Sequence, residues 1–120
     1  MRIEVREWIR AAEDDLEDAM VLLEAGRFAA AAFHAHQAVE KALKASIIAL
    51  KGELSPRIHN LIYLARVLDI KDENILDALR RLNPHYRISR YPDAAIGVPM
   101  DMYSESIALE LINEAKSVLE

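Results

Sequence analysis

The chain has 120 residues, of which 52% are hydrophobic, and it carries no cysteine and a formal net charge of −5 at pH 7. The absence of cysteine excludes disulfides and thiolate chemistry and fits the cytoplasm. No apolar run approaches the roughly 20 residues needed to cross a membrane, and the acidic balance argues against a general nucleic-acid-binding protein. By length we expect one domain over residues 1–120.

The charge is unevenly distributed along the chain. Residues 1–26 carry eight acidic and three basic side chains, and residues 101–120 have a net charge of −4. Between these acidic ends, residues 27–51 and residues 80–93 each have a net charge of +3. Two interpretations remain open: complementary charges on packed helices, or a localised anion site in an acidic protein.

Residues 3–25 form the first predicted helix. Its apolar positions follow the i, i+3, i+4, i+7 spacing of an amphipathic helix, and they are Val5, Trp8, Ile9, Ala12, Leu16, Ala19, Met20 and Leu23. Gly26 follows the last turn, where glycine is common. Because only Gly26 and Arg27 separate this helix from the next one, we expect the two helices to pack antiparallel.

Residues 28–51 are rich in alanine, contain no Gly or Pro and predict a long helix. On a helical wheel they form three stripes. The first stripe consists mainly of small side chains: Phe28, Ala31, Ala35, Ala38, Ala42, Ala45 and Ala49. The second is bulky, with Phe33, Leu43, Ile47 and Leu50 interrupted by His36 and Glu40, and the third is polar, with His34, Gln37, Lys41, Lys44 and Lys51. Such a helix is typically buried on several sides, so we predict the central column of a bundle with one polar seam.

The remaining chain is also predicted to be helical. Ser55-Pro56 is typical of an N-cap and first helical position, which predicts a helix over 56–68, and Asp72 is the expected cap of a helix ending at Leu82. Residues 83–100 contain three prolines and predict a long, ordered loop. A last helix is expected from about Ser104 to the end. The prediction is an all-α, up-and-down antiparallel bundle of about five helices.

Metal ligation is not expected from the histidine pattern. His34 and His36 are two positions apart, so on a helix they point about 200° from each other and cannot chelate one ion together. His-Glu-x-x-His and similar spacings are absent. We therefore expect neither a metal nor a cofactor. His59, near the start of a predicted helix, is interpreted as a structural residue that bonds back to the preceding loop.

The polar side chains of residues 34–44 allow two interpretations. His36, Glu40 and Lys44 follow one another at i, i+4 spacing, which is typical of an ion-pair ladder on an exposed helix face. Alternatively, Lys41 and Lys44, with Gln37, form a seam that meets a ligand or a second protomer.

The arginine-rich segment is the second candidate site. Arg80, Arg81, Arg87 and Arg90 fall within eleven residues and are interleaved with His85, Tyr86 and Tyr91. Guanidinium groups bind phosphates bidentately, and tyrosines stack on bases. In the alternative interpretation an Arg90–Asp93 salt bridge pins a turn and the other arginines are solvated.

Four segments together resemble the HEPN domain family. They are Ala-Glu-Asp-Asp-Leu at 12–16, His-Ala-His-Gln-Ala-Val-Glu-Lys-Ala-Leu-Lys at 34–44, His-Asn-Leu at 59–61 and Ser-Arg-Tyr-Pro-Asp at 89–93. The resemblance implies a helical bundle related to the C-terminal domain of kanamycin nucleotidyltransferase. It also implies a homodimer and a minimal nucleotidyltransferase partner, in a pair resembling a toxin–antitoxin module.

Many members of this family are metal-independent ribonucleases with an Arg-x4–6-His motif. The matching pair here is Arg80 and His85, which the resemblance makes candidate catalytic residues. The chain departs from the pattern, because Arg81 stands where a small polar residue is usual and Pro84 interrupts the helix before His85. Our leading hypothesis is therefore a protein that binds a nucleotide or RNA phosphate. The expected ligand-binding residues are Lys41, Lys44, Arg80, Arg87, Arg90 and Tyr91. The alternatives are an endoribonuclease using Arg80 and His85, or a purely structural interaction module.

Overall fold

The secondary structure of the described residues is entirely helical, which confirms the predicted all-α fold. The structure is a computed structural model, and it describes residues 2–52 and 56–119. The elements in chain order are α1 (Ile3–Glu24), α2 (Phe28–Lys51), α3 (Leu61–Val67), α4 (Glu73–Leu82), α5 (His85–Ile88), α6 (Pro92–Ala95), the 3-10 turn η1 (Pro99–Met102) and α7 (Glu105–Leu119). Among the described helices, none has the length and hydropathy of a membrane-spanning segment.

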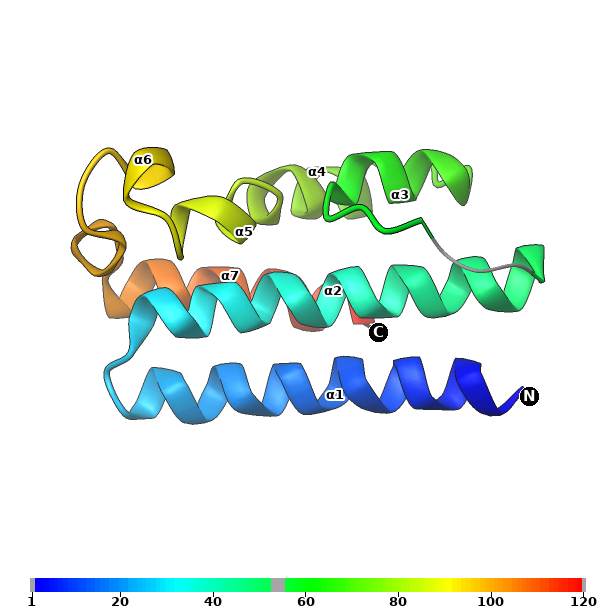
Figure 1. Ribbon diagram of the computed structural model, residues 1–120, viewed down its shortest axis with the longest axis horizontal. Coiled ribbons are helices and arrows are strands. Elements are labelled where there is room, and N and C mark those ends of the chain that lie inside the picture. Colours follow the sequence, from blue (N-terminus) through cyan, green and yellow to red (C-terminus); the bar gives the residue numbers. More distant parts are fainter. Residues whose placement is uncertain (1, 53–55, 120) are drawn as a thin grey trace.

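Helix α2 is the central column of the bundle, as predicted. In Figure 1, α1 lies along one side of α2, and α3, α4 and α5 lie along the opposite side. Its alanine stripe makes this possible, because Ala31, Ala35 and Ala38 are completely buried and let neighbouring helices approach closely. The bulky core side chains around the column include Ile47, Leu61, Leu64, Leu79, Leu82 and Ile112. Each such buried Leu or Ile contributes about 1.5–3 kcal/mol of transfer free energy.

The turn between α1 and α2 matches the prediction within one residue. Gly26 adopts φ +76°, a left-handed conformation that glycine reaches without steric cost. The two helices then run antiparallel along most of their length (Figure 1).

The predicted start of the third helix was wrong. Helix α3 begins at Leu61, and Asn60 is its N-cap, because the Asn60 side chain accepts hydrogen bonds from the backbone N–H groups of Ile62 and Tyr63 at 2.9 and 3.1 Å. The predicted cap Ser55 lies outside the described residues. Asn60 thereby satisfies the first free backbone donors of the helix. The preceding residues 56–60 run back along α2 without helical structure.

Residues 83–100 are more regular than the predicted long loop. They contain α5 and α6, each a single turn, and the start of the single-turn η1 at Pro99. The Ser89 hydroxyl donates to the carbonyl of His85, and Ile96 ends α6 in a left-handed conformation with φ +55°. The prediction of an ordered segment was right, but local capping bonds that carry no sequence period were missed. These turns bring the arginine-rich segment against the N-terminal half of α2 (Figure 1).

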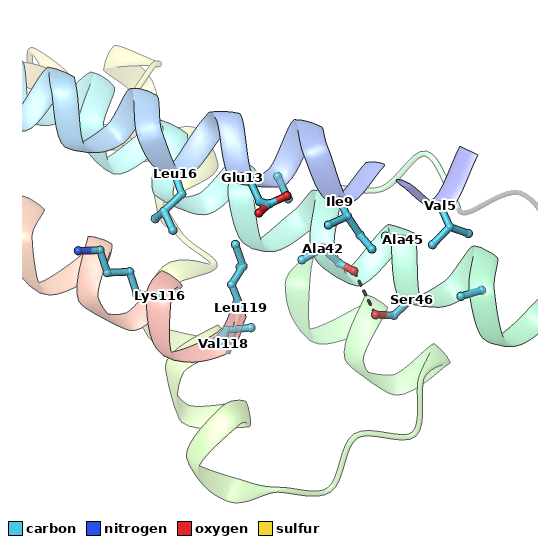
Figure 2. Close-up of a pocket in the computed structure, with 12 residues that line it drawn as sticks. Val5, Ile9, Glu13, Leu16, Ala42, Ala45, Ser46, Lys116, Val118 and Leu119 are labelled. Atoms are coloured by element: carbon cyan, nitrogen blue, oxygen red, sulfur yellow. Dashed lines mark hydrogen bonds between the residues drawn. The ribbon is translucent and has the colours of Figure 1, made fainter. Parts of the chain in front are cut away.

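An open apolar groove of about 730 Å³ lies between α1, α2 and the end of α7 (Figure 2). Helix α7 reaches only to the middle of α2 (Figure 1), so small residues of the C-terminal half of α2 form the groove floor. The lining includes Val5, Ile9, Leu16, Ala42, Ala45, Ala49, Val118 and Leu119, together with the charged residues Glu13 and Lys116. Leu50, which the wheel places on the bulky stripe, is 73% exposed at this end of α2.

Candidate functional site

The ladder of His36, Glu40 and Lys44 on α2 is buried rather than exposed. The three residues have relative exposures of 0%, 3% and 6%. The Lys44 ammonium donates to Glu40 Oε2 at 3.1 Å and also lies 6.0 Å from the ring centroid of Trp8. The prediction of an ion-pair ladder on an exposed face was therefore wrong. Lys44 is a buried partner of Glu40 rather than part of an open seam. The sequence pattern missed this because His59, Tyr86 of α5 and Trp8 of α1 pack against these side chains from outside α2.

The second oxygen of Glu40 binds a histidine from outside α2. His59 lies just before α3, and its Nδ1 is 2.9 Å from Glu40 Oε1. The His59 ring stacks on Tyr86 of α5, with centroids 4.0 Å apart and planes 12° apart. Tyr86 also contacts the rings of His36 and Phe33, at 5.5 and 5.9 Å. An aromatic row thus joins His59 to Phe33 along α2.

His36 is a buried histidine whose proton equilibrium is strongly perturbed. Burial lowers the pKa of His36 to about 4, and the carboxylate of Glu40 opposes that shift. Its Nδ1 lies 3.2 Å from the Gln37 side-chain oxygen, while Nε2 is buried without a hydrogen-bond partner among the described residues. The imidazole is therefore neutral at physiological pH.

We expect the free energy of unfolding to fall as the pH drops from 6.5 towards 4. The unfolded chain binds a proton on His36 near pH 6.5, whereas the folded chain binds it only near pH 4, so protons favour the unfolded state between these values. A shift of this size corresponds to a loss of roughly 3 kcal/mol. Urea unfolding across this interval measures it.

The variant His36→Leu should flatten most of that pH dependence. A residual slope is expected, because burial also lowers the pKa of His85. An equal slope in the variant and the wild type would contradict the assignment to His36.

A cleft of about 370 Å³ opens at the N-terminus of α2, next to the aromatic row. It is lined by Arg27, Ala29, Ala30, Phe33, Ser89, Arg90, Val98, Pro99 and Met100. The Arg90 guanidinium lies 4.6 Å from the Phe33 ring centroid and 5.5 Å from that of Tyr91. Arg27 is the N-cap residue of α2, and the first turn of α2 contains no acidic residue. In the described part of the chain, no carboxylate lies within ion-pair distance of Arg27 or Arg90.

The other arginines of the expected site are paired with carboxylates. Arg80 lies 2.6 Å from Asp77 and 3.3 Å from Glu73, and Arg81 lies 2.8 Å from Glu114. The predicted Arg90–Asp93 salt bridge was also wrong, because Asp93 pairs with Arg87, at 3.5 Å. Arg90 lies on aromatic rings instead.

The candidate catalytic pair Arg80 and His85 is not joined by a direct contact within the described part of the chain. Arg80 is exposed on α4 and bound to its own helix. His85 is half-buried at the start of α5, where its Nδ1 lies 2.6 Å from the hydroxyl of Tyr103. Helix α4 ends before Pro84, as the sequence predicts, so Pro84 separates the two residues into different helices.

Lys41 is bound to a buried carboxylate of α1. Asp15 is 6% exposed, and its two oxygens lie 2.6 Å from Lys41 Nζ and 2.8 Å from His34 Nδ1. With Asp18, the residues Asp15 and His34 place three potential metal-ligating atoms within 4.8 Å of one another. The histidine spacing could not reveal this group, because two of its members come from α1. The Lys41 ammonium already neutralises Asp15.

The structure therefore adds four residues that are absent from the expected set of ligand-binding residues. Arg27 and Phe33 line the cleft, and His59 and Tyr86 form the stacked pair. The net charge of +3 over residues 27–51 was a sequence signal that could have pointed to Arg27 as a site residue. The pairing of His59 with Glu40 joins positions 19 apart, and periodicity within one helix carries no information about it.

Comparison with known proteins agrees with this fold. Residues 5–120 match the HEPN domain family. The sequence is 34% identical over 125 residues to a Methanocaldococcus jannaschii protein named "Putative toxin MJ1304", and the match covers 94% of this chain and 82% of that protein.

Two crystal structures are similar to this chain. One is TT1696 from Thermus thermophilus, with a TM-score of 0.87 and 30% identity, covering 98% of this chain and 94% of the other. The second is ST0689, described as an archaeal HEPN homologue, with a TM-score of 0.78 and 34% identity over 96% of this chain and 91% of the other. The sequence match, the helical bundle and these relatives show that the chain belongs to the HEPN domain family.

Proposed function

We propose that this HEPN protein binds the phosphate of a nucleotide or RNA in the cleft between Arg27 and Arg90. The observation that carries the proposal is the presence of two arginines without carboxylate partners, among the described residues, beside one cleft. The N-terminus of the 24-residue helix α2 opens at the same place, and its free N–H groups and dipole favour an anion. Arginine and a helix N-terminus together are a recurrent phosphate site.

Aromatic side chains support a base next to that phosphate. Tyr91 is 41% exposed beside Arg90, and Phe33 lines the cleft. Stacking on such rings is sequence-tolerant and contributes about 1–3 kcal/mol per base. Arg87 is exposed and its single ion pair with Asp93 is at the surface, so it remains available to a second phosphate.

We further propose a toxin-like role in a module with a minimal nucleotidyltransferase. The relationship to a protein named "Putative toxin MJ1304" supports the toxin-like part. A homodimer is part of the proposal, and the apolar groove of Figure 2 is the surface that a second copy would cover. Glu13 and Lys116 lie in its lining, so a two-fold arrangement can place each against the opposite charge of the other copy.

The alternative of an endoribonuclease using Arg80 and His85 has less support. Both residues are engaged, Arg80 with Asp77 and Glu73 and His85 with Tyr103. A ligand that contacts both Arg80 and His85 would first have to displace the ion pairs that Arg80 forms with Asp77 and Glu73.

We expect the double variant Arg27→Ala/Arg90→Ala to lose about 100-fold in affinity for a short single-stranded RNA. Each charge-assisted hydrogen bond contributes about 1.5–3 kcal/mol, so each arginine accounts for about tenfold. Fluorescence anisotropy with an end-labelled RNA, and with ATP as competitor, measures the loss. The matched control is Arg80→Ala/Arg81→Ala, which removes two carboxylate-paired arginines and should change affinity by less than about threefold.

Equal losses in the two double variants would show that binding follows net charge rather than this cleft. Wild-type affinity in Arg27→Ala/Arg90→Ala would refute the phosphate site. Thermal melting of each variant shows whether the fold is retained.

A further inference from the structure

We propose that Asp15, Asp18 and His34 bind a divalent transition-metal ion, such as Zn²⁺, between the long helices α1 and α2. Each of the three residues offers one ligand atom, and these atoms all lie within 4.8 Å of one another. The expectation of no metal considered pairs of histidines, whereas only one ligand of this site is a histidine. The site shares no residue with the lining of the phosphate cleft, so it is independent of the proposed function.

The antiparallel packing of α1 and α2 brings the three side chains together. Asp15 and Asp18 are three positions apart on α1, so they are neighbours on its surface. His34 is in the second turn of α2, which lies alongside α1 (Figure 1). Its Nδ1 is 2.8 Å from Asp15 Oδ1. Atoms that each lie 2.0–2.2 Å from one ion are about 3 Å apart in neighbouring coordination positions, so this separation suits two ligands of the same ion.

The carboxylate of Asp15 is buried and incompletely hydrogen-bonded. Asp15 is 6% exposed, and its Oδ2 has no hydrogen-bond partner among the described residues. The Lys41 ammonium lies 2.6 Å from Oδ2, but the two atoms form an ion pair without the geometry of a hydrogen bond. Buried oxygens normally have their hydrogen bonds, and one that lacks them is often explained by an ion. Oδ2 therefore has the capacity to coordinate one.

The carboxylate of Asp18 has no structural role in the described part of the chain. Asp18 is exposed, and its side chain forms no ion pair or hydrogen bond with the residues that the structure describes. It nevertheless lies next to the carboxylate of Asp15, with Lys41 bound to Asp15 alone. Two carboxylates so close together repel each other. A cation that both of them coordinate relieves this repulsion.

The donor set indicates a transition metal rather than Mg²⁺ or Ca²⁺. The ligands are one imidazole nitrogen and two carboxylate oxygens, which suit Zn²⁺ and Ni²⁺, whereas Mg²⁺ and Ca²⁺ prefer oxygen ligands alone. With three protein ligands, water fills the remaining coordination positions. Because the ligands come from two helices, the ion links α1 to α2 and stabilises the folded chain, which alone presents all three ligands together.

Lys41 competes with the ion for Asp15. Its ammonium lies 2.6 Å from a carboxylate that the metal needs, and the two cations repel each other at that distance. The Lys41 side chain is 30% exposed, so its flexible stem can turn into solvent when the ion binds. A divalent ion that gains three ligands replaces a single ammonium that has one. Removal of the ammonium should therefore strengthen metal binding.

Titration calorimetry with Zn²⁺ tests the site in the wild-type protein and in matched variants. The wild type should bind Zn²⁺, and Asp18→Asn should lose at least about tenfold in affinity without loss of the fold, because the Asp18 side chain has no contact to give up. Asp14→Asn removes a neighbouring exposed carboxylate of α1 and should change affinity by less than about twofold. Lys41→Met should raise affinity at least about fivefold. With Co²⁺ in place of Zn²⁺, paramagnetic NMR shifts should be largest around Asp15, Asp18 and His34.

Four results would overturn the proposal. They are a wild type that binds no Zn²⁺, equal affinity of Asp18→Asn and the wild type, an equal loss in Asp14→Asn, and unchanged affinity in Lys41→Met. An equal loss in Asp14→Asn would show that the ion follows the acidic charge of α1, and an unchanged Lys41→Met would show that it bypasses Asp15. Thermal melting without metal checks the fold of each variant. If Asp18→Asn melts early, His34→Gln removes another ligand and should lose affinity as strongly.

Discussion

Truncating Glu40 to alanine is expected to destabilise the fold by about 3–5 kcal/mol. The substitution leaves the Lys44 ammonium buried, with its side chain 7% exposed, and without the carboxylate that lies 3.1 Å away. Breaking a buried ion pair from one side carries this cost because the remaining charge is desolvated and uncompensated. It also removes the acceptor of His59, so the segment before α3 loses its attachment to α2. Urea unfolding followed by circular dichroism measures the change.

The matched control is Asp14→Ala on α1. Asp14 and Arg10 form a pair with the same i, i+4 spacing, but their side chains are 69% and 81% exposed, so the expected change is below about 1 kcal/mol. Glu40→Ala/Lys44→Met, which removes both charges, should recover part of the loss. If Glu40→Ala costs no more than Asp14→Ala, the ladder is not buried in solution.

Truncating Ile47 to alanine is expected to cost about 2–5 kcal/mol. Ile47 is 2% exposed in the core around α2, and its truncation loses transfer free energy and leaves a cavity that the packed helices refill only in part. Chemical denaturation gives the free energy of unfolding directly.

Leu50 supplies the comparison within the same predicted stripe. The helical wheel places Ile47 and Leu50 together, but Leu50 is 73% exposed, so Leu50→Ala should change the free energy of unfolding by less than about 0.5 kcal/mol. Similar losses for both variants would mean that another part of the protein, or a second copy, covers the end of α2.

Local sequence signals were sufficient for the long helices. The alanine-rich run predicts α2 with its observed bounds, Phe28–Lys51, and Asp72 caps α4 as expected, accepting from the backbone of Asn74 and Ile75. The start of α3 was missed because Ser55-Pro56 has the pattern of a helix start, whereas the residue that caps the helix is Asn60. Short turns such as α5 and α6 depend on single capping contacts and have no period to detect.

The candidate site was less predictable, because its geometry depends on which helix faces are covered. The i, i+4 spacing of His36, Glu40 and Lys44 was visible, but their burial depends on packing by other elements. The pairing of arginines was also hidden: Arg80 is bound to its own helix, while Arg90 has aromatic neighbours contributed in part by α2. Contacts between distant segments leave no periodic trace in a single sequence.

The position of Trp8 gives this molecule an intrinsic optical probe. It is the single tryptophan of the chain, and its ring lies 6.0 Å from the Lys44 ammonium. Lys44 binds the same Glu40 carboxylate as the half-exposed His59, so the indole lies next to the charged pair that connects α2 to the segment before α3. Emission from this one residue can therefore follow, without any label and in real time, changes in the contacts of the buried Glu40–Lys44 pair.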